Sequence, residues 1–385
     1  MPARRARDAH GVSPLLRAIF LELPMHENTS YVTVHAEPMK AVARAIVGRT
    51  GSSAREAELV ADQLVEANLT GHDSHGVGML PRYIEVFRLG RLMVNQHVSV
   101  VLDAGALLTL DGNMGYGQVM AYEAMQMGIA RAAAHGVAVV GLSNSHHIGR
   151  IGHWAEQCIA AGLVSMHYVN VVSQPVVAPF GGRDARFVTN PFCVGIPRPG
   201  EEPVVLDFAT SRIAMGKVRV AMNKGVEVGA GILLDHQGEA TRDPQVMFRQ
   251  PFGAILPFGE HKGYCLAMVC ELLGGALSGG RTLHERTPGR EIVNNMFSII
   301  IDPQRLGTAA NLAAETAEFA AWVKESPLAQ GVDRIKLPGE PEQDNRRERG
   351  AKGIPIDPTT WTEIIGTAGL LGLAQREVEQ LAGLA

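Results

Sequence analysis

The chain has little of what several large protein classes require. It contains no uninterrupted apolar run of the ~20 residues that span a bilayer, so no membrane insertion is expected. Its formal net charge is -4, and no Lys/Arg-rich block is interleaved with aromatic residues, so nucleic acid is not an expected partner. The four cysteines lie in apolar runs without a CxxC pair, which indicates buried thiols in a reducing compartment, the cytoplasm, rather than a cysteine zinc site.

Common catalytic fingerprints are also missing. There is no GxGxxG after a predicted strand, no GxxxxGK[ST], no HExxH and no GxSxG, which argues against a Rossmann domain, a P-loop, a zincin and an α/β-hydrolase. A dinucleotide would therefore have to bind to another architecture. Fourteen histidines permit a metal site, but His146 and His147 are adjacent and cannot easily face one ion from a regular element, so no metal is predicted.

What remains is a chain of 385 residues with 46% hydrophobic content, enough for two domains or for one large domain with a subsidiary one. The first 24 residues superficially resemble a targeting peptide, but Arg17, Glu22 and Pro24 interrupt the apolar stretch. We interpret residues 1–30 as a disordered extension or as the result of a start codon assigned too early, with Met25 as an alternative first residue.

The apolar pattern alternates between helical and strand-like periods, which favours an α/β protein with a mixed sheet. The segment 36–69 predicts two helices split at residues 51–53, where Ser53 and Glu56 match a capping box. A polar, Pro-containing stretch at 337–352 is interpreted as a surface connection. Further helices are expected at 82–89, 118–135, 153–161, 260–276, 308–326 and from 359 onward, and strands at 98–110, 137–142, 163–171, 192–196, 204–208 and 299–301.

The octet Gly71-His72-Asp73-Ser74-His75-Gly76-Val77-Gly78 concentrates two imidazoles, a carboxylate and a hydroxyl directly after a predicted helix. A histidine held beside a serine at a helix end titrates close to neutral pH and can exchange a proton with a substrate. The alternative is a set of polar residues that only cap the helix.

Other polar segments lie at predicted strand ends, where open α/β sheets place ligands. The segment 143–152, with Gly149 and Arg150, has the glycines, helix start and guanidinium that suit a phosphate, or is an ordinary strand-to-helix turn. Asp207 ends an apolar strand and accepts a ribose hydroxyl or caps a helix. His261 and Lys262 begin an apolar helix and meet an anion or only solvent.

Taken together, five ordered motifs resemble the type-2 malate/lactate dehydrogenase family over about residues 30–380. They are GHDSHGV at 71–77, NSHHIG at 144–149, TNP at 189–191, LDFATS at 206–211 and HKGY at 261–264. Within that family, SHHIGRIG, VAPF, GGALSGG and LPGE are most similar to the hydroxycarboxylate dehydrogenase B branch.

The resemblance implies an NAD- or NADP-dependent enzyme that reduces 2-oxo acids to 2-hydroxy acids, and the reverse. It implies a non-Rossmann α/β fold and a homodimer with its active site near the subunit interface. By the same matching, His75 is the acid/base beside the nicotinamide, assisted by Ser74 and His147. The dinucleotide contacts would be His75, Gly149, Arg150, Ile151, Val205, Leu206, Asp207, Phe208, Ala209, His261, Lys262, Asn294, Gly339, Glu340, Pro341 and Glu342.

We therefore expect a mixed-sheet NAD(P)-binding domain over 121–304 and a discontinuous helical substrate domain from 31–120 plus 305–385. Arg82, Arg150 and Lys262 are candidates for the substrate carboxylate. Two alternatives stay open. One is a cyclic imine or keto-sugar-acid reductase on the same fold, and the other is a nucleotide-binding protein without turnover.

Overall fold

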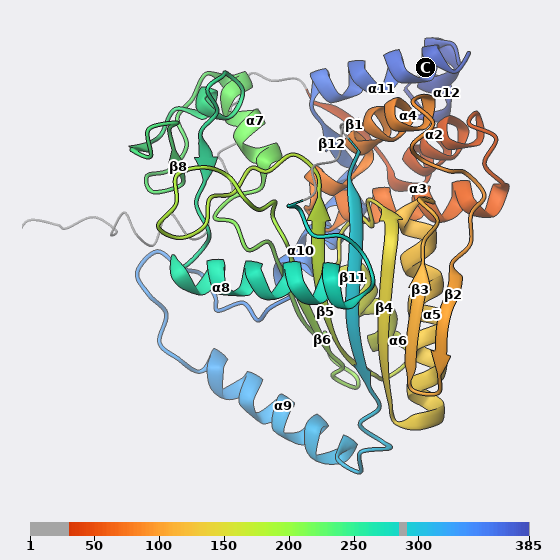
Figure 1. Cartoon of the computed structure of the whole chain (residues 1–385), viewed down its shortest axis with the longest axis vertical. Helices are drawn as coiled ribbons and strands as arrows, with labels where there is room; N and C mark the ends of the chain where they lie inside the picture. The colour runs from red at the N-terminus through yellow and green to blue at the C-terminus, as the bar shows by residue number, and fades with distance from the viewer. Residues whose placement is uncertain (1–30, 285–290, 385) are drawn as a thin grey trace, which may run out of the picture.

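A seven-stranded sheet forms the centre of the molecule, in the order β2-β3-β4-β11-β5-β6-β7 (Figure 1). The computed structural model describes residues 31–284 and 291–384. Only β3 and β4 pair in parallel, and the other neighbours are antiparallel, so the expected mixed α/β sheet is confirmed. The strands are β2 (Ser99–Ala104), β3 (Leu107–Asp111), β4 (Val137–His146), β5 (Val164–Val172), β6 (Phe192–Ile196), β7 (Val204–Phe208) and β11 (Val293–Ile301).

Helices cover both faces of this sheet. On one face lie α5 (Gly117–His135) and α6 (Gly152–Ala160), and on the other lies α8 (His261–Cys270) with its π-helical continuation η4 (Glu271–Leu277). Successive residues of β4 point to opposite faces of the sheet. Val140 faces α5, where a Cβ added to Gly128 would meet its side chain. Gly141 faces the end of η4, where an added Cβ would meet the backbone of Ser278.

Segments from the two ends of the chain pack together beside the sheet (Figure 1). Strand β1 (Val32–Val34) pairs with β12 (Ile354–Ile356). Helix α3 begins after Ser53, whose side chain accepts the Glu56 amide as predicted. The helices in contact are α2 (Ala36–Gly48), α3 (Ala54–Leu69) and α4 (Leu80–Arg88) with α10 (Glu340–Lys352), α11 (Pro358–Leu370) and α12 (Gln375–Leu381).

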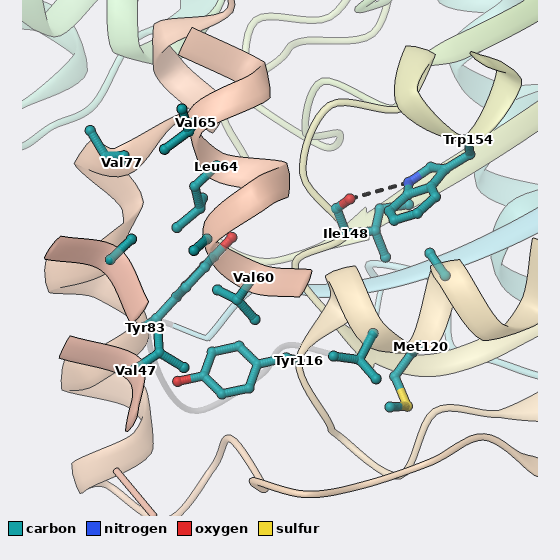
Figure 2. Close-up of a cluster of buried hydrophobic side chains, with 14 of the residues drawn as sticks. Val47, Val60, Leu64, Val65, Val77, Tyr83, Tyr116, Met120, Ile148 and Trp154 are labelled. Atoms are coloured by element: carbon teal, nitrogen blue, oxygen red, sulfur yellow. Dashed lines mark hydrogen bonds between the residues drawn. The ribbon is translucent and has the colours of Figure 1, made fainter. Parts of the chain in front are cut away.

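One hydrophobic core runs from these helices into the sheet and crosses the expected domain boundary at residue 120 without a break. Leu64, Met120 and Trp154 belong to it, and Trp154 Nε1 donates a hydrogen bond of 3.2 Å to the Ile148 carbonyl (Figure 2).

A second, smaller core was not predicted. Val177, Val218 and Leu233 are among its members. It lies among α7 (Met215–Lys224), η3 (Pro244–Met247), and the strands β8 (Leu233–Leu234), β9 (Ala240–Thr241) and β10 (Ala254–Ile255), which form a three-stranded sheet.

Three predictions about local structure were wrong. The stretch 337–352 is not a surface connection but carries α10, which has Pro341 in its first turn, where a missing amide hydrogen costs nothing. The segment 98–110 is a hairpin with Gly105 at φ +68°, not one strand. Cys265 is exposed because it lies on the outer side of α8, while Gly263, Ala267 and Cys270 face inward. The helix expected at 308–326 is present as α9 (Ala309–Lys324).

The extension predicted for residues 1–30 lies outside the described residues. Within 31–284 and 291–384, no helix is long and apolar enough to cross a membrane.

Candidate active site

Two histidines that are far apart in the sequence meet at the carboxyl end of β4. His75 Nδ1 lies 3.1 Å from His147 Nε2, and the planes of the two rings are nearly parallel, at 8° to each other. His75 ends the short 3-10 helix η1 (Asp73–His75), and His147 directly follows β4. The structure thus brings together the two histidines that the sequence motifs single out.

The octet is shaped by Asn68 near the end of α3. Its Oδ1 accepts the Val77 amide at 2.8 Å, and its Nδ2 donates to Asp73 at 2.7 Å. A Cβ on Gly76 would lie 2.2 Å from Asn68 Oδ1, so only glycine fits there. Arg349 of α10 holds the Asp73 carboxylate with contacts of 2.6 and 3.1 Å. These bonds fix the turn that presents His75.

Behind His147 lie two side chains that the sequence analysis missed. The Tyr83 hydroxyl is 2.7 Å from His147 Nδ1, and Gln118 Nε2 donates to that hydroxyl at 2.7 Å. Tyr83 and Gln118 are buried, on α4 and α5. No local sequence signal distinguishes them from ordinary core residues of amphipathic helices.

The surroundings keep both histidines uncharged near neutral pH. Burial lowers the pKa of His75 to about 4, and the Coulombic interactions with His72 and Arg150 act in the same direction. The pKa of His147 also lies well below its ordinary value because of burial, with His75 and His146 adding to the effect. The expectation that the octet's histidine titrates close to neutral pH was therefore wrong, since it ignored desolvation.

Ser74 is exposed and faces the start of α7, because a Cβ on Gly216 would lie 3.2 Å from the Ser74 Cβ. It has no hydrogen bond to the histidine pair among the contacts of the described chain.

The strand-to-helix segment around Arg150 differs from the expected anion site. The guanidinium is buried, its Nη2 binds Glu156, and its Nη1 lies 3.8 Å from Asp207. Asp207 Oδ2 also accepts the Gly152 amide at 2.8 Å and so caps α6. The sequence left two roles open for Asp207, binding a ribose hydroxyl or capping a helix, and the structure shows it as a helix cap. The side chain of Arg150 is turned into the protein rather than toward an external phosphate.

Segments expected to hold a dinucleotide converge beside this loop. The Val205 amide donates to the Pro338 carbonyl at 3.0 Å, and Gly339 has φ +96° with the Val205 backbone close by. His72 Nε2 lies 3.2 Å from Glu342 Oε1, which joins the octet to the start of α10. Residues 339–342, which include Glu340 and Pro341, thus lie between β7 and the octet. The expected contact residues Leu206 and Phe208 lie on β7, and Ala209 directly follows this strand.

Asn294, His261 and Lys262 occupy different environments. Asn294 is buried and uses its side chain to accept the Ile148 amide at 3.0 Å and to donate to the Asn170 carbonyl. It therefore supports the loop that carries His147, and its expected contact with a cofactor stays a prediction. His261 and Lys262 are exposed at the start of α8, where Glu260 has φ +58°, a strained value for a residue with a side chain.

A tight loop follows His147. Gly149 has φ +75°, and a Cβ there would lie 2.2 Å from Gln63 Oε1, so this loop packs closely against α3. The Nε of Arg150 is buried without a hydrogen-bond partner in the described chain. Among the described residues, no group of His, Cys, Asp and Glu is arranged to hold a metal ion.

Comparison with known proteins agrees with this arrangement. The chain is 51% identical over 347 residues to hydroxycarboxylate dehydrogenase B of Escherichia coli (strain K12), which covers 89% of this chain and 96% of that protein. The structure of sulfolactate dehydrogenase from Methanocaldococcus jannaschii matches with a TM-score of 0.81 at 30% identity, covering 90% of this chain and 99% of the other. That of delta1-piperideine-2-carboxylate reductase from Pseudomonas syringae pvar. tomato matches with a TM-score of 0.77 at 31% identity, covering 92% and 100%. The sequence profile described as malate/L-lactate dehydrogenase matches residues 34–365, and the chain belongs to that family.

Proposed function

We propose that the protein reduces 2-oxocarboxylic acids to 2-hydroxycarboxylic acids with NADH or NADPH, and catalyses the reverse reaction. The observation that carries this proposal is the His75–His147 pair, held at 3.1 Å within the family's two histidine motifs. Candidate substrates are hydroxypyruvate, phenylpyruvate, 2-oxoglutarate and acids of the malate or lactate type. The names of the similar enzymes, hydroxycarboxylate dehydrogenase B and sulfolactate dehydrogenase, support a 2-hydroxy acid as substrate.

In this proposal His75 exchanges a proton with the oxygen on C2 of the substrate. A placed histidine typically contributes ~10²- to 10⁴-fold to the rate. The nicotinamide, when bound, supplies the hydride in the reduction and accepts it in the reverse reaction. His147 orients the His75 ring by the hydrogen bond between them. Because burial disfavours the imidazolium form of His75, proton donation should become easier as the pH falls toward 4.

The dinucleotide would lie along residues 149–151, 205–209 and 339–342, with His261 and Lys262 at its exposed side. The convergence of these segments supports the fit, because the Val205 amide donates to the Pro338 carbonyl and Glu342 lies against His72 of the octet. Since Asp207 is occupied by Arg150 and Gly152, its carboxylate is a poor basis for preferring NAD over NADP. Arg82, Arg150 and Lys262 were considered as partners of the substrate carboxylate, and of these three side chains only Lys262 is exposed.

The proposal includes a division of roles and an assembly. Residues 121–304 would hold the dinucleotide, and 31–120 with 305–385 would shape the substrate side, although both share one core.

The protein would form a homodimer in the cytoplasm, where its four free cysteines suit the reducing conditions. An apolar surface on α8 and η4 supports the dimer: Met268, Val269, Leu272 and Leu277 are 36–60% exposed.

The test is the loss of absorbance of NADH and of NADPH in the presence of purified protein and a panel of 2-oxo acids. The panel contains pyruvate, hydroxypyruvate, phenylpyruvate, 2-oxoglutarate and oxaloacetate. Turnover that is abolished in His75→Ala supports the proposal. The rates across the panel then rank the 2-oxo acids as substrates and NADH against NADPH as cofactor. Absence of turnover with every pair would contradict it.

A second candidate is reduction of a cyclic imine, because the reductase for delta1-piperideine-2-carboxylate shares the fold over 92% of this chain. The same assay with that imine distinguishes the two, since a preference for the imine over all 2-oxo acids would replace the first proposal. Keto-sugar acids belong in the same panel. Tight NADH binding without oxidation by any compound would favour a binding protein without turnover.

A further inference from the structure

Tyr83 and Gln118 form a hydrogen-bonded chain that ends at His75 but have no role in the reaction as proposed so far. The chain runs from Gln118 Nε2 to the Tyr83 hydroxyl, then to His147 Nδ1, and from His147 Nε2 to His75 Nδ1, with distances of 2.7, 2.7 and 3.1 Å. It joins α5 and α4 to the histidine pair. Every member between the two ends is both a donor and an acceptor.

The direction of the bonds follows from the hydrogens available. The Tyr83 oxygen accepts from the Gln118 amide, and His147 Nδ1 is its other hydrogen-bond partner in the described chain. The single hydrogen of the phenol therefore has that nitrogen as its acceptor. A neutral His147 then carries its hydrogen on Nε2 and donates it to His75 Nδ1. A neutral His75 is left with its hydrogen on Nε2.

We propose that Tyr83 and Gln118 are positioning residues that fix the tautomers of His147 and His75, so that His75 offers a hydrogen on Nε2 to the substrate oxygen. The proposal rests on the proposed function for the role of His75. It deepens that function because it explains how an uncharged His75 can donate a hydrogen bond to the carbonyl that is to be reduced.

The environment supports this direction. Burial raises the pKa of the Tyr83 phenol, so its hydrogen is retained. Burial likewise keeps both imidazoles neutral, and a neutral pair has one hydrogen to place on each ring. The choice between the two nitrogens is then made by the hydrogen-bond partners rather than by titration.

Gln118 suits this position because its amide fixes the direction by donating. Its Oε1 has no partner in the described chain, and the residue lines a cavity of about 250 Å³ together with Gln63 and His153. The amide nitrogen is the Gln118 atom that bonds to the Tyr83 hydroxyl.

The experiment reads the tautomer directly. Protein labelled with ¹⁵N-histidine is studied without ligands by long-range ¹H–¹⁵N correlation, which distinguishes an imidazole protonated at Nδ1 from one protonated at Nε2. The His147 resonances are identified by their loss in His147→Gln. We expect the His147 hydrogen on Nε2 in the wild-type protein and a mixture of both tautomers in Tyr83→Phe. A wild-type His147 protonated at Nδ1, or a Tyr83→Phe spectrum unchanged from wild type, would overturn the proposal.

Tyr116→Phe is the matched control. Tyr116 packs edge-on against Tyr83, with ring centroids 5.9 Å apart, and Figure 2 shows the two hydroxyls pointing in opposite directions. We expect this variant to keep the wild-type tautomer and turnover. A loss of the tautomer in Tyr116→Phe equal to that in Tyr83→Phe would mean that general packing, not the phenol, sets it.

Kinetics give the second readout. In Tyr83→Phe we expect kcat for the best 2-oxo acid to fall about tenfold or more, with the KM for NADH changed less than about threefold. An unchanged kcat would contradict the positioning role. Since the spectra need no substrate, a protein with the expected tautomers but no turnover would refute the proposed function and leave the direction of the hydrogen bonds intact.

Discussion

Replacing Asn68 with alanine should loosen the turn that presents His75. Asn68 is 4% exposed, and its side chain satisfies the Val77 amide, which lies on a residue only 1% exposed. A buried amide left without an acceptor costs about 1–3 kcal/mol. The lost bond to Asp73 adds little, because that carboxylate is half exposed and keeps Arg349. Alanine's better helix propensity returns about 0.5 kcal/mol, so we expect Asn68→Ala to lower the free energy of unfolding by about 0.5–2.5 kcal/mol.

The same change should reduce turnover more than it reduces cofactor binding. His75 lies between Asp73 and Val77, the two residues that Asn68 ties together, and misplacing a catalytic group by about 1 Å can cost ~10²-fold. We therefore expect kcat to fall at least about tenfold.

Urea unfolding and steady-state kinetics test both parts of this reasoning. Asn345→Ala is the control, because that asparagine makes only a 3.4 Å hydrogen bond to the Thr70 carbonyl from the neighbouring α10. It should change stability by less than about 0.5 kcal/mol. If Asn68→Ala is as stable and as active as this control, the Asn68 bonds do not hold the turn.

Three further predictions concern the site, the acid stability and the assembly. His75→Ala should lower turnover by at least ~10²-fold while NADH still binds, as fluorescence titration would show; near-wild-type turnover would remove His75 from its role. His153 has its pKa lowered from 6.5 to about 4 by burial, so the unfolded state takes up its proton first and stability falls as the pH drops between these values. His153→Gln should remove up to about 1.4 kcal/mol per pH unit from that slope near pH 5, and an unchanged slope in urea unfolding would contradict the assignment. Leu272→Asp should convert the dimer to a monomer in light scattering, whereas Leu89→Asp, on an exposed residue away from α8 and η4, should not; a monomeric wild-type protein refutes the assembly.

Elements with a strong local signal could be predicted from the sequence. The apolar run at 137–142 forms the first part of β4, and the Ser53 cap begins α3 as expected. Helix α10 could not be predicted in this way because no residue in it is fully buried and its charged side chains bind distant elements. Arg346 contacts Glu66 and Arg349 contacts Asp73, so its stabilising partners lie more than 270 positions away in the sequence.

The site residues divide along the same line. His75 and His147 could be found because each lies in a dense polar motif, and family resemblance joined them. The contacts that Arg150 and Asn294 make inside the protein could not be predicted. The sequence does not distinguish a side chain that binds a buried neighbour from one that binds a ligand. Arg150 reaches Asp207 on β7, and Asn294 on β11 reaches the Ile148 backbone, so these partners become apparent only once the sheet is assembled.

The ionisation of the histidine pair is the clearest case of information that only the fold contains. A sequence gives His75 an ordinary pKa, yet the three-dimensional surroundings lower it to about 4 and so remove the charge that the simplest acid mechanism needs. Once the charge is gone, the hydrogen on His75 has to be directed by its neighbours. Tyr83 and Gln118 are the side chains that connect to it through His147, and they come from two helices whose sequences show only a buried apolar face. The chemistry of the motif histidine is therefore decided by core residues that no motif contains.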